Sequence, residues 1–118
     1  MEKRSYAAIY QAKKLKEIKG NFTPNYISKM RDSVLVRIYL TCSKLYYHLS
    51  ISAVSDQIFD LICKELLERL KSGKTLIAWE DELVCINPSA LQAGTGYHIQ
   101  NFPKTIENIA YEYSLLVA

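Results

Sequence analysis

The residues best suited to chemistry fall into two groups within positions 46–60. The first group joins aromatic rings to an imidazole, and the second spaces two carboxylates and a ring at i, i+3 and i+4. That spacing places side chains on one face of a helix. The two groups are Tyr46, Tyr47 and His48, followed by Asp56, Phe59 and Asp60.

Aromatic faces beside carboxylates suit a flat cationic ring that carries a ribose. Stacking and cation–π attraction hold such a ring, and carboxylates accept hydrogen bonds from hydroxyls. A phosphate prefers free N–H groups at a helix start. The negative charge of Asp56 would repel a phosphate there, so we expect the cationic ring and its ribose to be the bound part of the ligand. A purely structural alternative stays open, in which these residues start a helix, fill the core and pack two helices together.

The elements that position these groups are helices. With four Gly and three Pro in 118 residues, turns are few, and we predict a mostly α fold in one domain, 1–118. A basic helix is expected within 1–20, a helical hairpin over 24–72, and an irregular or short-strand segment near 74–102. A C-terminal helix over about 103–116 completes the chain, and Gly20 is expected to end the first helix.

The hairpin has clear start signals. Thr23 is a suitable N-cap and Pro24 fits the first helical position, where its missing N–H costs nothing. Two apolar stripes run from Pro24 to Leu49, which predicts a central helix with neighbours on both sides. At 1.5 Å per residue this helix would be about 39 Å long, so it has room for a break or a bend. Ser55 caps the next helix, and Gly73 ends it.

Positions 74–102 are ambiguous in the sequence. The apolar runs Leu76–Trp79 and Leu83–Ile86 predict either two short strands or a helical turn and a strand. Asn87 and Pro88 open a turn or a short helix.

Charge is distributed unevenly. Residues 1–40 hold nine Lys and Arg against three acids, whereas residues 41–118 hold six against nine. A basic front end suits an acidic protein surface or nucleic acid. No nucleic-acid motif accompanies it, and a solvated helix face is the preferred explanation. The candidate partner-binding residues are Lys13, Lys14, Lys16 and Lys19.

Cysteine and histidine give no sign of a metal site or a catalytic triad. Cys42, Cys63 and Cys85 are odd in number with no CxxC pair, and the only histidines are His48 and His98. Three unpaired thiols are typical of a reducing compartment. No apolar run of about 18 residues or secretory signal is present, so we expect a cytoplasmic protein with no membrane partner.

Two segments carry a resemblance to a known family. Residues 46–66 read YYHLSISAVSDQIFDLICKEL, and residues 93–97 read AGTGY. Over roughly 35–97 the chain resembles the N-terminal Ia domain of NAD-dependent DNA ligases, in the form of small stand-alone ligase-related proteins of bacteriophages. The resemblance implies a bacteriophage protein acting in the host bacterial cytoplasm.

In that family the domain closes over NAD⁺ and grips its nicotinamide mononucleotide half. The residues that the resemblance carries over as the cofactor-binding set are Tyr47, His48, Asp56, Phe59 and Asp60. Phe59 replaces a family tyrosine, so its ring can stack but a hydroxyl is lost. The loop between His48 and Asp56 is about one residue shorter than in the family and lacks its proline.

Ligase chemistry needs a Lys-x-Asp-Gly motif, and the chain has none. We therefore expect a non-enzymatic binding protein that requires no cofactor, with nicotinamide mononucleotide or NAD as its ligand. The alternative is a phage protein that inhibits or redirects a host protein by direct contact, for host takeover or anti-defence, such as anti-CRISPR activity. Nucleic acid is the least favoured partner, and the sequence leaves the oligomeric state open.

Overall fold

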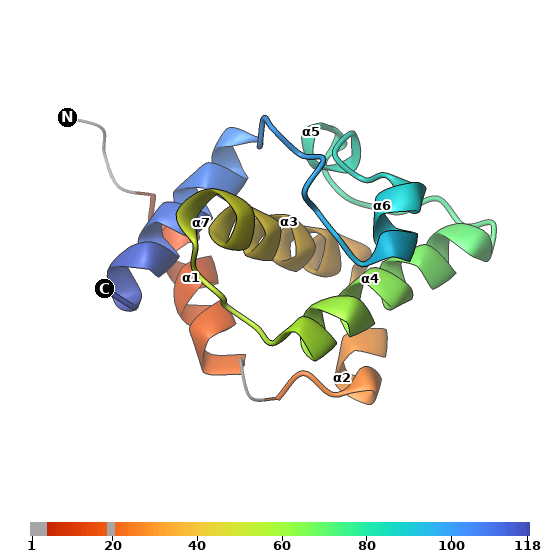
Figure 1. The fold of residues 1–118 in the computed structure, drawn as a ribbon, viewed down its shortest axis with the longest axis horizontal. Coiled ribbons are helices and arrows are strands. Elements are labelled where there is room, and N and C mark those ends of the chain that lie inside the picture. Colours follow the sequence, from red (N-terminus) through yellow and green to blue (C-terminus); the bar gives the residue numbers. More distant parts are fainter. Residues whose placement is uncertain (1–4, 19–20) are drawn as a thin grey trace.

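The computed structural model describes residues 5–18 and 21–118, and this part of the chain is built from helices without strands (Figure 1). The mostly α prediction is confirmed. The helices are α1 (Tyr6–Ile18), α2 (Pro24–Ser28), α3 (Asp32–Leu49), α4 (Asp56–Lys71), α5 (Glu80–Leu83), α6 (Pro88–Ala93) and α7 (Lys104–Leu116).

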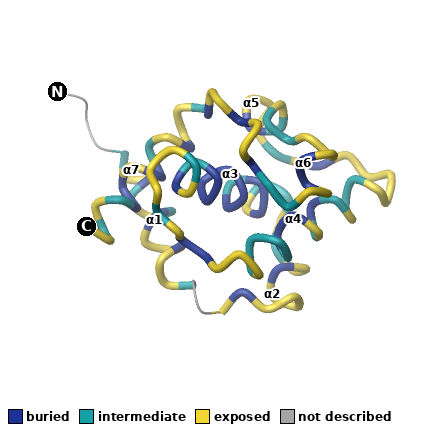
Figure 2. Tube along the Cα trace, in the orientation of Figure 1, coloured by how far each residue is buried: buried dark blue, intermediate teal, exposed yellow. Residues whose placement is uncertain are grey.

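Helix α3 lies in the centre of the molecule. It packs against α7 on one side and α4 on another, while α1 packs against α7 and α6 against α4. Most of α3 is buried from Leu35 to Leu45 (Figure 2), including the ring of Tyr39. Helix α3 therefore has neighbouring helices on two sides, as its two apolar stripes predict.

The helical stretch expected from Pro24 to Leu49 contains the break for which its length left room. The Thr23 Oγ1 accepts a hydrogen bond from the Tyr26 N–H at 3.1 Å, as predicted for the cap, but α2 ends at Ser28. The backbone is extended at Arg31 (φ −66°, ψ 151°), and α3 starts at Asp32.

A cluster around Arg69 of α4 holds this break in place. Its guanidinium donates to the Asp32 carboxylate at 2.9 Å and to the carbonyls of Ile27 and Ser28, at the end of α2. The second Asp32 oxygen accepts from the Ile77 N–H at 3.0 Å. The carbonyls that an unbroken helix would use internally are thus satisfied by a side chain from another helix.

Of the two alternatives expected for 74–102, an irregular segment or short strands, the short strands are not formed. The described chain there forms α5 and α6, joined by turns. Glu80, Asp81 and Glu82 occupy the first turn of α5, where negative charge meets the positive end of the helix dipole. Asn87 caps α6 by accepting from two backbone N–H groups.

The other predicted helix ends agree with the structure. The Ser55 Oγ accepts from the Ile58 N–H at 3.2 Å at the start of α4, and Gly73 follows its end with φ +82°. The predicted stop at Gly20 lies outside the described residues. No helix in residues 5–18 and 21–118 has the length and apolar character needed to cross a membrane.

Candidate functional site

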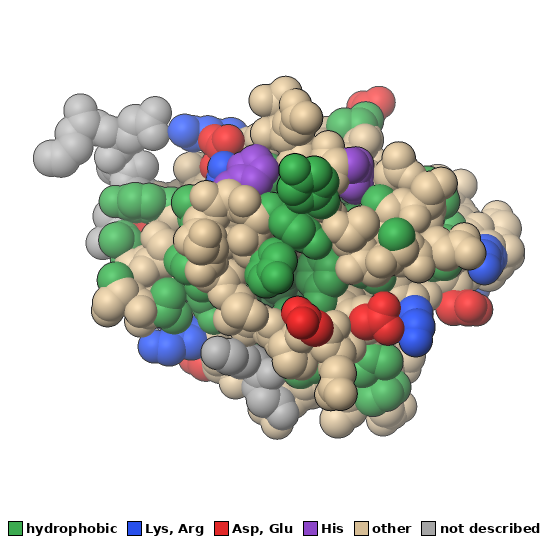
Figure 3. Space-filling model, in the orientation of Figure 1, with side chains coloured by type: hydrophobic (Ala, Val, Ile, Leu, Met, Phe, Trp, Pro, Cys, Tyr) green, Lys and Arg blue, Asp and Glu red, His purple; other side chains and the backbone are tan. Residues whose placement is uncertain are grey.

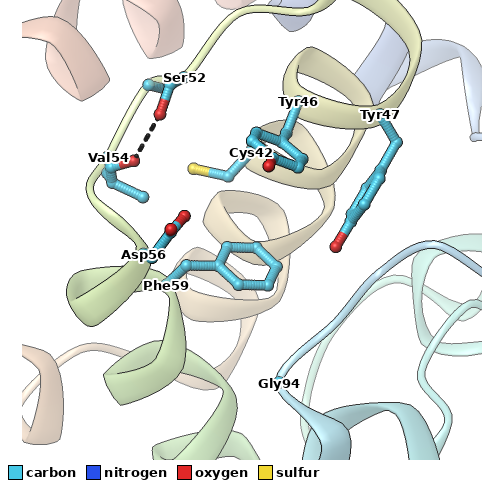
Figure 4. A pocket seen from close by; sticks show the side chains of 9 residues that line it. Cys42, Tyr46, Tyr47, Ser52, Val54, Asp56, Phe59 and Gly94 are labelled. Atoms are coloured by element: carbon cyan, nitrogen blue, oxygen red, sulfur yellow. Dashed lines mark hydrogen bonds between the residues drawn. The ribbon is translucent and has the colours of Figure 1, made fainter.

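A pocket of about 140 Å³ opens where the end of α3, the start of α4 and the loop after α6 meet. Figure 3 shows a hollow with apolar walls on this face of the molecule, with acidic side chains along one edge. We call it the aromatic pocket. Its main side chains are Cys42, Tyr46, Tyr47, Asp56 and Phe59, and residues 52–54 and Gly94 complete its rim (Figure 4).

The first wall comes from the last turns of α3. Tyr46 and Tyr47 are in edge-to-face contact with ring centroids 4.9 Å apart. Ser50 ends the helix in the left-handed conformation (φ 57°), and the Ile51 N–H donates to the Leu45 carbonyl. This turn carries the chain directly across to the start of α4.

The second wall comes from the first turn of α4. The Ser55 cap fixes the helix start, so Asp56 and Phe59 lie on one face, three residues apart. The Phe59 ring stacks on the buried Tyr39 ring with centroids 5.6 Å apart and planes 28° from parallel. The core of α3 thus holds the Phe59 ring in position at the pocket.

The third wall comes from the 93–97 loop, of which Gly94 lines the pocket. Gly94 takes the left-handed conformation (φ 71°) that ends α6, and Gly96 lies directly against Ser43 of α3. The Tyr39 hydroxyl donates to the Thr95 carbonyl at 2.7 Å, and the Tyr47 and Thr95 hydroxyls are hydrogen bonded at 2.8 Å.

Tyr97 extends this loop over the pocket wall. Its ring contacts the Tyr47 ring edge to face at 5.6 Å. The AGTGY segment therefore anchors a tyrosine of the pocket through both a hydroxyl and a ring, which gives this segment a structural role in the site.

Three of the five predicted cofactor-binding residues, Tyr47, Asp56 and Phe59, line the aromatic pocket. His48 lies outside this lining: its ring contacts Phe102 at 5.2 Å, and its Nδ1 is 3.3 Å from the Lys44 ammonium. A helix turns about 100° per residue, so His48 projects in a different direction from Tyr47.

Asp60 also lies outside the lining, although it is close to the third wall. Its carboxylate pairs with Lys64 at 3.1 Å, and its Oδ1 would lie 3.0 Å from a Cβ added at Gly94. Asp60 therefore faces the loop after α6, one turn beyond the Asp56 carboxylate.

Sequence reasoning missed Cys42 as a pocket residue, although a signal for it existed. Cys42 precedes Tyr46 by four residues, so the two share one face of α3. Cys42 is almost fully buried, and burial raises the pKa of its thiol to about 12, with a further contribution from Cys63. The thiol is protonated at neutral pH and is a poor nucleophile there.

Asp56 is the carboxylate that lines the pocket, and Asp60 lies one helical turn further along α4. Asp56 is exposed at the rim, and within the described residues no basic side chain pairs with it. No Lys or Arg of the described chain lines this pocket, and no group of potential metal ligands occurs in that part of the chain. The site offers ring faces, one negative charge and hydrogen-bond acceptors.

Three of the four predicted partner-binding lysines lie on α1. Lys13, Lys14 and Lys16 are exposed, and the Lys16 ammonium donates to the Leu116 carbonyl of α7 at 3.2 Å. Lys19 lies outside the described residues. Tyr6 and Tyr10 on the same helix are 86% and 62% exposed.

The fold and the site define a helical protein with an aromatic pocket edged by a carboxylate. Comparisons of this chain with protein-family models, with curated proteins and with solved structures find no match.

Proposed function

We propose that this chain is a non-catalytic binding protein that holds the nicotinamide end of nicotinamide mononucleotide or NAD⁺ in the aromatic pocket. The observation that carries the proposal is the convergence of three aromatic rings, from Tyr46, Tyr47 and Phe59, around a rim that bears the Asp56 carboxylate. Two helix ends and a loop far along the chain cooperate to form it.

The volume of the pocket supports a single ring as its occupant. A cavity of ~150 Å³ accommodates a benzene molecule, and this pocket measures about 140 Å³. Pockets that enclose drug-sized ligands are larger, roughly 300–1,000 Å³. The nicotinamide ring would fill the pocket, and the remainder of the nucleotide would lie outside it.

The chemistry of the walls supports the same ligand. The oxidised nicotinamide ring carries a positive charge, which aromatic faces attract. Asp56 adds a Coulombic attraction and can accept hydrogen bonds from the ribose hydroxyls. The resemblance of residues 35–97 to the ligase Ia domain, which grips the nicotinamide mononucleotide half of NAD⁺, supports the same part of the nucleotide as the ligand.

Isothermal titration calorimetry with nicotinamide mononucleotide and NAD⁺ tests the proposal. We expect dissociation constants below about 1 mM, which corresponds to roughly 4 kcal/mol of binding free energy. Tyr46→Leu should weaken binding because it removes one of the three rings of the pocket. The Tyr46 side chain is 51% exposed and contributes little to the core, so the fold should persist.

The matched control is Tyr111→Leu, which removes a similarly exposed tyrosine from α7. It should leave the affinity unchanged. The absence of heat with either nucleotide at millimolar concentration would refute the proposal, and an equal loss in both tyrosine variants would show that binding occurs elsewhere.

A second candidate is favoured by α1. Tyr6 and Tyr10 are highly exposed on a helix that also presents Lys13, Lys14 and Lys16. Exposed tyrosines are frequent at protein interfaces, so this surface suits an acidic host protein that a phage product would inhibit or redirect. Pull-down from host lysate with the wild type and with Lys13, Lys14, Lys16 and Lys19 changed to Glu tests it: no partner, or equal recovery by both, counts against it.

A further inference from the structure

We infer that the aromatic pocket selects its ligand by the positive charge of an N1-substituted pyridinium ring, and that the phosphate group contributes no binding energy. The inference rests on the proposed function, and it names the ligand class: pyridinium ribosides, with or without phosphate. It predicts discrimination between the oxidised and reduced forms of the same nucleotide.

The charges of the described residues carry the first step. The charged side chain that lines the pocket is the Asp56 carboxylate, and no lysine or arginine of the described residues lines it. The lysines of α3 and α4 that are close in sequence to the pocket residues have other contacts. Lys64 pairs with Asp60 at 3.1 Å. Lys44 lies against the Phe102 ring, with its ammonium 5.6 Å from the ring centroid. A ligand in this pocket therefore contacts one negatively charged side chain and no positively charged one among the residues that line it.

The start of α4 gives the second step. A helix N-terminus can bind phosphate through its free N–H groups. Here the Ser55 side chain accepts from the Ile58 N–H and so occupies one of these groups. Asp56 at the first helical position adds a carboxylate to the same turn, so an anion placed there would be repelled.

Four neutral or charged probes separate the contributions. Nicotinamide riboside, which lacks the phosphate, should bind as tightly as nicotinamide mononucleotide or slightly more tightly. Reduced nicotinamide mononucleotide, whose ring is neutral, should bind about tenfold more weakly or worse. The same contrast is expected between 1-methylnicotinamide, a permanent cation, and neutral nicotinamide.

The sign of the Asp56→Asn effect is the sharpest test. If ring charge drives binding, this variant should weaken the affinity for nicotinamide mononucleotide about fivefold. If phosphate drove binding, the same variant would strengthen it by removing a repulsion. Asp56 is exposed and its side chain caps nothing, so the fold should persist, as circular dichroism can verify.

Glu68→Gln is the matched control. It makes the same charge change on the same helix, twelve residues or about 18 Å further along, beyond the screening length at physiological salt. It should leave the affinity unchanged.

The outcomes distinguish the two proposals. Binding of nicotinamide mononucleotide with a tenfold loss for its reduced form supports both. Equal binding of oxidised and reduced forms, a tenfold weaker riboside, or tighter binding by Asp56→Asn overturns the charge inference while the proposed function stands. No binding of any pyridine nucleotide overturns both.

Discussion

Replacing Gly96 with Ala should separate the 93–97 loop from α3. A Cβ at this position would lie 2.6 Å from the Ser43 Cβ and closer still to the Ser43 Oγ. Ser43 is fully buried, and its hydroxyl donates to the Tyr39 carbonyl at 2.8 Å, so it has no room to move aside. The loop or the helix must therefore shift.

The expected loss in the free energy of unfolding is about 3 kcal/mol. Overpacking a close contact costs about 1–3 kcal/mol. A shifted loop also weakens the two hydrogen bonds that Thr95 makes with Tyr39 and Tyr47, each of which contributes about 1 kcal/mol. Backbone strain adds nothing at this position, because Gly96 does not have a positive φ, in contrast to Gly73 and Gly94.

Urea denaturation followed by circular dichroism measures this loss, and a double-mutant cycle identifies its cause. Ser43→Gly alone costs about 1 kcal/mol, through its lower helix propensity together with the lost hydrogen bond to the Tyr39 carbonyl. In the double variant the new methyl group occupies the space that the serine vacated, and the next neighbour, the Tyr39 hydroxyl, is 3.5 Å away. The double variant should therefore be more stable than the sum of the single losses by about 1–2 kcal/mol.

Gly73→Ala provides the control. Gly73 has φ +82° and no heavy atom within 4 Å of an added Cβ, so the substitution costs about 1 kcal/mol through backbone conformation alone. Ser43→Gly should not recover that loss. If the Gly96 and Ser43 changes add within about 0.5 kcal/mol, the contact between them is not the cause and the reasoning is refuted.

Three further predictions concern buried groups. Arg37→Met should lower the free energy of unfolding by about 3–5 kcal/mol in urea denaturation, because it leaves the 1% exposed Glu82 carboxylate without the guanidinium that lies 3.0 Å away; an effect below 1 kcal/mol would contradict this. Burial raises the pKa of Cys42 and Cys63 from 9.0 to about 12, so above pH 9 the unfolded chain loses protons that the native state keeps, and stability should fall by up to about 1.4 kcal/mol per pH unit per thiol. Cys42→Ala should reduce that slope in melts between pH 9 and 11, and an unchanged slope would count against the assignment. With iodoacetamide at pH 8, mass spectrometry of the native protein should find Cys85, the most exposed of the three, labelled first; labelling of Cys63 before Cys85 would disprove the burial argument.

Much of the helical architecture could be predicted because its signals are local. The caps at Thr23 and Ser55, the proline at the first position of α2 and the stop at Gly73 each act within a few residues. The two apolar stripes of α3 indicated a central helix for the same reason, since periodicity alone shows which faces must be covered.

The break between α2 and α3 could not be located from the local sequence. It depends on Arg69, which is 37 residues beyond Asp32 and reaches the carboxylate and two carbonyls at the end of α2. The helical conformation of 79–83 could not be predicted for a similar reason. Glu82 is buried against Arg37, whose guanidinium also lies 3.7 Å from the centroid of the Trp79 ring, so a long-range ion pair fixes the conformation of 79–83.

The sequence predicted part of the candidate site, and helix geometry explains which residues it placed correctly. Adjacent residues of a helix point about 100° apart, so the end of α3 cannot direct Tyr46, Tyr47 and His48 into one pocket. The stripe that includes Tyr39, Cys42 and Tyr46 indicates the correct direction, because it faces Phe59 and the start of α4. His48 lies past this face and packs on Phe102 instead.

The third wall of the pocket depends on a residue with no side chain. Gly96 lets the 93–97 loop approach α3 closely enough for Thr95 to bond both Tyr39 and Tyr47. Tyr39 in turn supports the Phe59 ring from behind. The loop, the core of α3 and the first turn of α4 are therefore linked by direct contacts. The aromatic pocket keeps its shape only while all three segments hold these positions. The AGTGY segment and the 46–60 segment therefore form one site in the folded chain, although neither segment indicates in the sequence that it contacts the other.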